Sequence, residues 1–491
     1  MTNASLIGNR RIRALVGIAI SAAAFGGLAS MSWSEDAAPA AASSSGASPV
    51  DHRLDQVEQQ LKSLQEEVSA GQRAHSLRLT APGQATAQQN EPAGEATAGR
   101  SGFALQSDDG DFVIRFSGLI QADGRFYTGQ GGNSSSYTSA VNASGQAPAF
   151  SGFSLRRVRP ILAGTLYHNF DFFFQPDFGG NAAAIYDAYL DVKPWTAANL
   201  RVGKFKTPLG VERLQTDSNL VFAERGLTAD LIPQRDTGVE LYGSFWRGAL
   251  TYQASFTNGT ADGAFTPDSP VSNSKDGTAR IFAQPFKNAA VAPLNGLGVG
   301  LAGSYSRDNI AVPTYKTASG QEQFFSYAAA TAFSGERIHW VPQANYYWGP
   351  LGLYGEYAQS SQVARTGNFK QRLTNDAWQV AASCVLTGEH ASYTGVQPSK
   401  NFDTRAGTWG AWEIAARFHQ LQVDPNTFSQ GFASLATSAS RATAYTAGLN
   451  WYLNKFVKFT TDYEQAWFKG GNGAGNRPIE RVVDTRWQVA F

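Results

Sequence analysis

Few charged residues, almost no sulfur and no long apolar run set the first limits on this chain. Charged residues make up 16% of its 491 residues, cysteine occurs once and methionine twice. Ordinary soluble domains are about a quarter charged, so a soluble helical enzyme matches poorly. The single Cys384 excludes an intramolecular disulfide framework and a cysteine-based metal site. Beyond the N-terminus no apolar run reaches the ~18 residues of a membrane-spanning helix, which excludes a helical membrane protein.

Aromatic residues and glycine are abundant instead. Aromatics make up 12% of the chain and glycine accounts for 50 residues, a composition that excludes disorder throughout and is typical of many short membrane strands. The net charge of +1 gives no global field for nucleic acid, and the six histidines show no metal-ligand spacing. Residues 112–491 alone carry 32 basic and 27 acidic side chains, so this part of the chain is basic.

The N-terminus has the pattern of an export signal. Arg10, Arg11 and Arg13 precede an apolar stretch over residues 14–28, and small residues follow it. A positive segment, an apolar segment and a small-residue site together predict a secretory signal peptide over residues 1–30, with an uncleaved anchor helix as the alternative. We therefore expect a protein that is exported from a bacterial cytoplasm.

A short heptad segment follows between two linkers. Residues 31–50 and 73–111 are assigned to linkers, because their Ala, Ser, Pro, Gly and Gln content gives little to pack. Residues 51–72 carry apolar side chains at alternating spacings of three and four: Leu54, Val57, Leu61, Leu64 and Val68. This spacing predicts a periplasmic coiled coil, and because so short a helix is marginal alone we favour self-association over one helix lying on the body.

From residue 112 the hydrophobic period changes to two. In the last eleven residues one face carries Val483, Thr485, Trp487, Val489 and Phe491, and the other carries Asp484, Arg486 and Gln488. Such alternation is typical of transmembrane barrel strands, and a C-terminal aromatic residue is typical of strands that the barrel-assembly machinery recognises. We therefore expect Phe491 to contact that machinery and the outer face to contact outer-membrane lipid.

Sixteen such strands fit between residues 112 and 491. The sequence thus predicts an all-β fold, a sixteen-stranded antiparallel transmembrane β-barrel with a short N-terminal coiled coil, with the barrel over 112–491. Sixteen strands leave an aqueous lumen, whereas eight would be filled by side chains. The longest loops are expected near 207–235 and 307–336, and the first is the third loop, which we expect to fold inward as a constriction.

Chemical motifs are few. Residues 298–303 match the dinucleotide fingerprint in letters, but they lie inside an alternating strand with no helix after them. We find no Gly-x-Ser-x-Gly nucleophile elbow. We therefore expect no enzyme activity, no cofactor and no bound metal, and an outer-membrane enzyme with a scattered Ser, His and acid set stays as the remote alternative.

Basic residues in and beside the third loop are the candidate pore-lining set: Arg157, Arg159, Lys204, Lys206, Arg213, Arg225 and Arg235. Lumen-facing Arg and Lys lower the barrier for anions and are the usual device of phosphate pores. Five acidic residues lie nearby and could neutralise them: Glu212, Asp217, Glu224, Asp230 and Asp236. Arg156 and Arg157 must also point to opposite faces unless a bulge intervenes. The residues alone leave open whether the lumen selects anions.

Several ordered segments resemble the phosphate-selective porin O/P family. They are residues 153–159 (FSLRRVR), 187–190 (DAYL), 202–210 (VGKFKTPLG), 222–225 (FAER), 233–238 (PQRDTG), 387–389 (TGE), 409–413 (WGAWE) and 448–454 (GLNWYLN). The resemblance covers about residues 110–491. It implies a homotrimeric sixteen-stranded outer-membrane channel whose basic lumen guides phosphate or polyphosphate. By motif position it points to Arg157, Arg159, Lys204, Arg225 and Arg235, although we identify no full arginine ladder of the phosphate-specific members.

The sequence therefore predicts a passive outer-membrane porin for small anions, with phosphate or pyrophosphate as the permeant. A general or carbohydrate-type diffusion porin on the same barrel is the first alternative.

Overall fold

A computed structural model describes residues 95–99, 102–128, 150–180, 183–270, 272–289 and 291–491. The expected signal peptide and coiled coil, and most of the linkers, lie outside the described residues. Every described residue belongs to one compact unit that starts at Glu91. Among these residues, no helix is long and apolar enough to cross a membrane.

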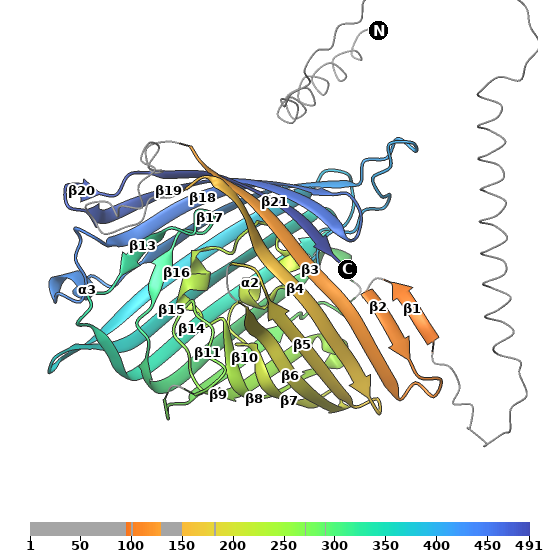
Figure 1. Ribbon diagram of the computed structural model, residues 1–491, viewed down its shortest axis with the longest axis horizontal. Helices are drawn as coiled ribbons and strands as arrows, with labels where there is room; N and C mark the ends of the chain where they lie inside the picture. The colour runs from red at the N-terminus through yellow and green to blue at the C-terminus, as the bar shows by residue number, and fades with distance from the viewer. Residues whose placement is uncertain (1–94, 100–101, 129–149, 181–182, 271, 290) are drawn as a thin grey trace, which may run out of the picture. The chain divides into compact units, whose positions relative to one another are not determined.

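Antiparallel strands form a closed barrel in the described part of the chain (Figure 1). The barrel strands are β3 (Phe112–Tyr127), β4 (Gly152–Leu166), β5 (Phe170–Asp177), β6 (Ala184–Trp195), β7 (Ala198–Lys206), β8 (Arg235–Phe245), β9 (Leu250–Thr257), β10 (Asp276–Ala283), β11 (Leu297–Ile310), β14 (Ala332–Trp348), β15 (Leu351–Thr366), β16 (Phe369–Val385), β17 (Ala411–Gln422), β18 (Ala439–Tyr452), β19 (Val457–Asn472) and β21 (Glu480–Ala490). Each pairs with the next, and β21 pairs with β3 from Val482↔Tyr127 to Ala490↔Leu119, which closes the sheet. The predicted sixteen-stranded barrel is confirmed.

The period-two pattern separates two faces along each strand. On β21 the side chains of Trp487 and Val489 are exposed, while Arg486 and Gln488 are buried in the lumen. Lipid on one side and water or protein on the other select this alternation. The predicted faces of the last strand are confirmed.

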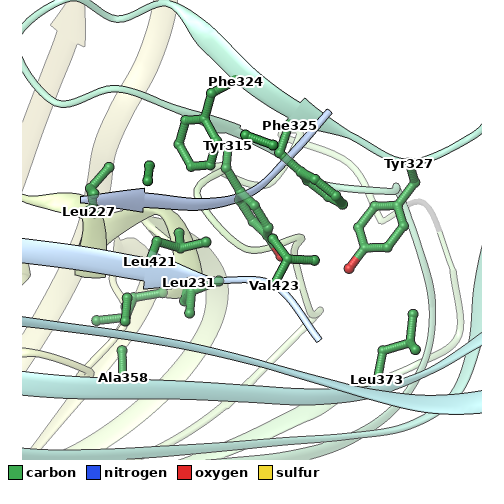
Figure 2. Close-up of a cluster of buried hydrophobic side chains, with 14 of the residues drawn as sticks. Leu227, Leu231, Tyr315, Phe324, Phe325, Tyr327, Ala358, Leu373, Leu421 and Val423 are labelled. Carbon is green, nitrogen blue, oxygen red and sulfur yellow. The ribbon is translucent and has the colours of Figure 1, made fainter. Parts of the chain in front are cut away.

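Loops at one end of the barrel fold into the lumen. Loop 207–234 joins β7 to β8, and loop 311–331 joins β11 to β14. Their apolar side chains meet in a buried cluster that includes Leu227, Leu231, Tyr315 and Phe324 (Figure 2). Burial of these side chains away from water holds the loops inside the barrel.

Short elements complete these loops and the turns. They are α2 (Val211–Leu214), η1 (Asp217–Asn219) and η2 (Leu227–Leu231) in loop 207–234; η3 (Trp246–Gly248) and η4 (Ala292–Leu294) in turns; β12 (Thr314–Lys316) and β13 (Gln323–Ser326) in loop 311–331; α3 (Asn426–Ser429) and β20 (Gly475–Asn476) further on.

A hairpin precedes the barrel within the segment that the sequence assigned to a linker. β1 (Glu95–Gly99) pairs with β2 (Gly102–Gln106), and β2 pairs with the start of β3. A Cβ on Gly102, whose φ is +85°, would lie 2.1 Å from the carbonyl oxygen of Phe116, so this close approach needs glycine. Composition alone indicated a linker because a five-residue strand leaves little periodic signal.

β3 therefore pairs with two strands in tandem along one edge. β2 occupies its first residues, β21 occupies its second half, and the backbone of Phe491 exchanges hydrogen bonds of 2.9 and 3.1 Å with Gly118 between them. The Phe491 ring lies 6.3 Å from the rings of both Phe103 and Phe116. The C-terminus is thus packed against the N-terminal hairpin.

Candidate functional site

Loop 207–234 crosses the lumen and is hydrogen-bonded to the far wall. The Val211 N–H donates to Glu356 on β15 at 2.8 Å, and the Ala223 N–H donates to Asp462 on β19 at 2.7 Å. Arg417 on β17 donates to the carbonyl of Glu224 at 2.9 Å. These bonds replace the water that the loop backbone would otherwise need, so the inward position of the loop is fixed by strands far away in sequence.

A β-bulge places two consecutive arginines on the same side of β4. Gln121 pairs with Arg157 and Ala122 pairs with Leu155, which leaves Arg156 as the extra residue. Both guanidinium groups then reach one carboxylate, because Arg156 Nε lies 2.7 Å and an Arg157 nitrogen 3.3 Å from Glu224. The bulge thus resolves the facing of Arg156 and Arg157 that strict alternation left open.

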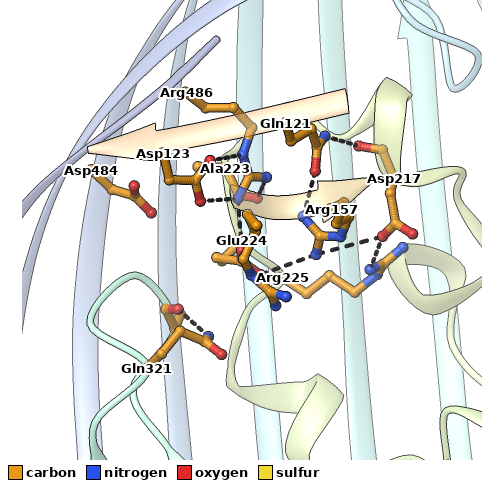
Figure 3. A network of polar contacts seen from close by, with 12 residues as sticks. Gln121, Asp123, Arg157, Asp217, Ala223, Glu224, Arg225, Gln321, Asp484 and Arg486 are labelled. Carbon is orange, nitrogen blue, oxygen red and sulfur yellow. Dashed lines mark hydrogen bonds and ion pairs between the residues drawn. The ribbon is translucent and has the colours of Figure 1, made fainter. Parts of the chain in front are cut away.

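Two carboxylates of loop 207–234, Asp217 and Glu224, form ion pairs with most of the neighbouring arginines (Figure 3). Asp217 pairs with Arg159, with Arg225 at 2.5 Å and with Arg157 at 3.8 Å. Glu224 also pairs with Arg486 of β21 at 2.7 Å. The arginine cluster is therefore largely neutralised within the protein.

The pKa values of both carboxyl groups follow from this surrounding charge. Burial would raise the pKa of Asp217, but the positive charges of Arg225, Arg157 and Arg159 outweigh it and hold the pKa well below its usual value. Burial is likewise outweighed at Glu224, whose pKa is held well below its usual value by Arg156, Arg157 and Arg486. Both groups therefore stay ionised at neutral pH.

The remaining candidate cations have separate partners. Arg235 pairs with Asp187 at 3.1 Å, and Lys204 pairs with Asp268 of the loop after β9 at 2.8 Å. Lys206 donates to the carbonyl of Gln215 at 2.8 Å, and Arg213 to that of Ala229 at 2.6 Å. The structure thus brings Arg157, Arg159 and Arg225 together at Asp217 but takes Lys204 to a different loop.

A vestibule of about 710 Å³ lies between loop 207–234 and the barrel wall. Seven basic and two acidic side chains line it: Arg115, Arg159, Arg201, Lys206, Arg235, Lys455 and Lys458, with Asp187 and Asp217. Basic side chains therefore outnumber acidic side chains by five in this lining. Such a surplus raises the local concentration of anions.

Four of these cations were absent from the candidates drawn from the sequence: Arg115, Arg201, Lys455 and Lys458. Arg115 alternates with the exposed Ile114 and Phe116, so its inward direction could be read from period two. Lys458 alternates with apolar neighbours in the same way. All four lie away from the third loop in sequence or before its start, whereas most of the candidates lie in or beside that loop.

A second inward segment, residues 386–410, enters from the opposite end of the barrel, between β16 and β17. The Tyr393 hydroxyl donates to the carbonyl of Val211 at 2.8 Å, and the Gln215 side chain donates to the carbonyl of Tyr393 at 2.8 Å. Thr394 and Gln397 line the vestibule beside loop 207–234. The two segments therefore bound the vestibule together.

Comparisons with known proteins agree with this architecture. The family model described as phosphate-selective porin O and P matches residues 127–491. Porin O of Pseudomonas aeruginosa is 22% identical over 396 residues, which span 75% of this chain and 86% of that protein. The outer membrane channel DcaP of Acinetobacter baumannii has a similar fold, with a TM-score of 0.52, 10% identity and coverage of 80% of this chain and 100% of that chain.

Proposed function

The chain belongs to the phosphate-selective porin O and P family and is an outer-membrane porin, not an enzyme; from this we propose that it forms a passive, water-filled channel for small anions, with phosphate or pyrophosphate as its main permeants. The excess of basic over acidic side chains in the vestibule lining is the observation that carries this proposal. Cations along a pore lower the electrostatic barrier for anions.

Within this proposal, loop 207–234 forms the selectivity constriction. Its support is the set of hydrogen bonds that carry the loop across the lumen to β15, β17 and β19. Arg159, Lys206 and Arg235 line the vestibule directly, while Arg157, Arg213 and Arg225 hold the loop and its carboxylates in place. Permeation then depends on the surplus of vestibule charge rather than on any one unpaired arginine.

We further propose a homotrimer, with the heptad segment 51–72 as a periplasmic coiled coil that assists assembly. The apolar outer face meets outer-membrane lipid, and the C-terminal strand with Phe491 engages the barrel-assembly machinery before the barrel closes.

Single-channel recordings in a KCl gradient test the proposal. We expect a reversal potential of the anion-selective sign and a block of chloride current by added phosphate. Arg235→Gln should reduce the anion preference at low salt, because it removes a vestibule charge. Lys204→Gln is the matched control, since Lys204 pairs with Asp268 and is outside the vestibule lining. A reversal potential near zero with no phosphate block would favour a general or carbohydrate-type porin.

A further inference from the structure

We propose that the vestibule contains a subsite for aromatic carboxylates, formed by Arg115, Ala163 and Phe173. The subsite rests on the proposed function, because it needs an anion passage through the vestibule. All three residues belong to the vestibule lining.

The three residues stand in one row across the inner wall. Arg115 on β3 pairs in register with Ala163 on β4, and Ala163 pairs with Phe173 on β5. A direct neighbour of each on its own strand is exposed on the outer face: Phe116 after Arg115, Leu162 before Ala163 and Phe174 after Phe173. Alternation therefore directs all three side chains of the row into the lumen.

One face of the Phe173 ring is already covered. Phe173 stacks on Tyr189 of β6, with 5.2 Å between ring centroids and 12° between planes, and the guanidinium of Arg201 lies 4.0 Å from the Tyr189 centroid. Because Tyr189 is on the following strand, the second face of Phe173 is turned toward β4. Its register partner on that strand, Ala163, contributes just a methyl group.

The space above Ala163 fits one aromatic ring. Neighbouring strands are about 4.8 Å apart, so Arg115 and Phe173, two strands apart, are separated by about 10 Å at the backbone. A planar ring in contact at ~3.5 Å on each side fills about 7 Å of such a gap. A larger side chain at position 163 would close it.

Arg115 is the cation available to a ligand in this gap. Arg201 is held by Asp191 and Arg235 by Asp187. In the described ranges, Arg115 by contrast has no acceptor within hydrogen-bonding distance and no carboxylate within ion-pairing distance. Its guanidinium can therefore form charge-assisted hydrogen bonds to an incoming carboxylate.

The combination selects an anion with a planar apolar body. Inorganic phosphate gains nothing from the face of Phe173, whereas benzoate gains an aromatic contact there and an ion pair with Arg115. The stack Phe173–Tyr189–Arg201 thereby gives the vestibule a preference for aromatic over inorganic anions, which positive charge alone does not supply.

Benzoate as a blocker of chloride current through the purified full-length protein tests the subsite, with cyclohexanecarboxylate and acetate as non-aromatic probes. We expect benzoate to block more strongly than either. Phe173→Leu should weaken the benzoate block about two- to tenfold, the range for one aromatic contact. Ala163→Leu should abolish it by filling the gap, and Arg115→Gln should weaken it. Phe174→Leu on the outer face of the same strand is the matched control and should leave the block unchanged.

Equal block by benzoate and cyclohexanecarboxylate, or an Ala163→Leu variant that keeps the benzoate block, would overturn the subsite. If phosphate block and anion selectivity persist in that result, the proposed channel function stands without it. Saturation-transfer NMR on the same variants measures the binding of benzoate directly, without any measurement of conduction. Benzoate binding that is lost in Ala163→Leu would support the subsite even if the channel proved cation-selective. Cation selectivity would refute the proposed function but not the subsite.

Discussion

Neutralising Asp217 should increase the anion preference of the channel. Asp217 is one of two acidic side chains in the vestibule lining, and it faces Arg157, Arg159 and Arg225 at once. Asp217→Asn keeps the size of the side chain and an oxygen that accepts hydrogen bonds, but it removes the negative charge that those arginines share. The surplus of positive charge in the lining then rises by one.

The size of the effect follows from the repulsion that the Asp217 carboxylate exerts on a passing anion. At ~4 Å this repulsion is about 1 kcal/mol in bulk water and about 4 kcal/mol at an effective dielectric of 20. At ~1.4 kcal/mol per tenfold change, its removal corresponds to about a fivefold gain in bulk water and a several hundredfold gain at the effective dielectric of 20. A wide, water-filled vestibule favours the lower figure.

Reversal potentials in a KCl gradient at low and high ionic strength measure this change. We expect Asp217→Asn to move the potential further toward the chloride limit at low salt and to lose most of the shift in 1 M salt, where the Debye length is about 3 Å. Asp268→Asn is the matched control, because Asp268 is 57% exposed and lies outside the vestibule lining. An unchanged reversal potential for Asp217→Asn at low salt would show that the Asp217 charge does not act on permeating ions. That result would refute the expected increase in anion preference.

Three further outcomes are expected. Phe491→Lys should lower outer-membrane insertion in cells more than it lowers the unfolding midpoint of the purified barrel, and normal insertion would contradict a role in assembly. Gly102→Val should detach β2 from β3, because its Cβ would collide with the Phe116 carbonyl; faster hydrogen exchange over residues 102–116 measures this, and unchanged exchange would refute it. Deletion of 51–70 should leave the barrel intact but weaken the trimer, and unchanged trimer melting and assembly rate would count against the coiled coil.

Strand positions were predictable because each strand separates two different environments. Lipid outside and polar contacts inside impose a period of two that the sequence must follow, as the alternation in β21 illustrates. The hairpin β1–β2 was not predictable, since strands of five residues are too short to show that period clearly.

The pairing of charges inside the lumen was beyond the sequence pattern. Arg486 meets Glu224, which is 262 positions away in the chain, only because loop 207–234 turns inward and crosses to β21. The bulge at Arg156 likewise depends on the register between β3 and β4. Lys204 and Lys206 are two positions apart on β7, whereas their partners lie in different loops. Composition showed that residues 112–491 are basic overall, and tertiary contacts decided which cations remain available.

The seam at β3 also sets the order in which the molecule can become complete. β3, the first barrel strand, can pair along its second half only after β21, the last strand, is present. Asp123 on β3 and its partner Arg486 on β21 are 363 positions apart in the sequence. Contacts of such long range form slowly, because the entropy of closing the loop must be met before they stabilise anything. Until then β3 and β21 are two open edges able to pair with other chains. β2 precedes β3 directly in the sequence and pairs with its first residues. It therefore shortens the edge of β3 that stays open until β21 pairs with it.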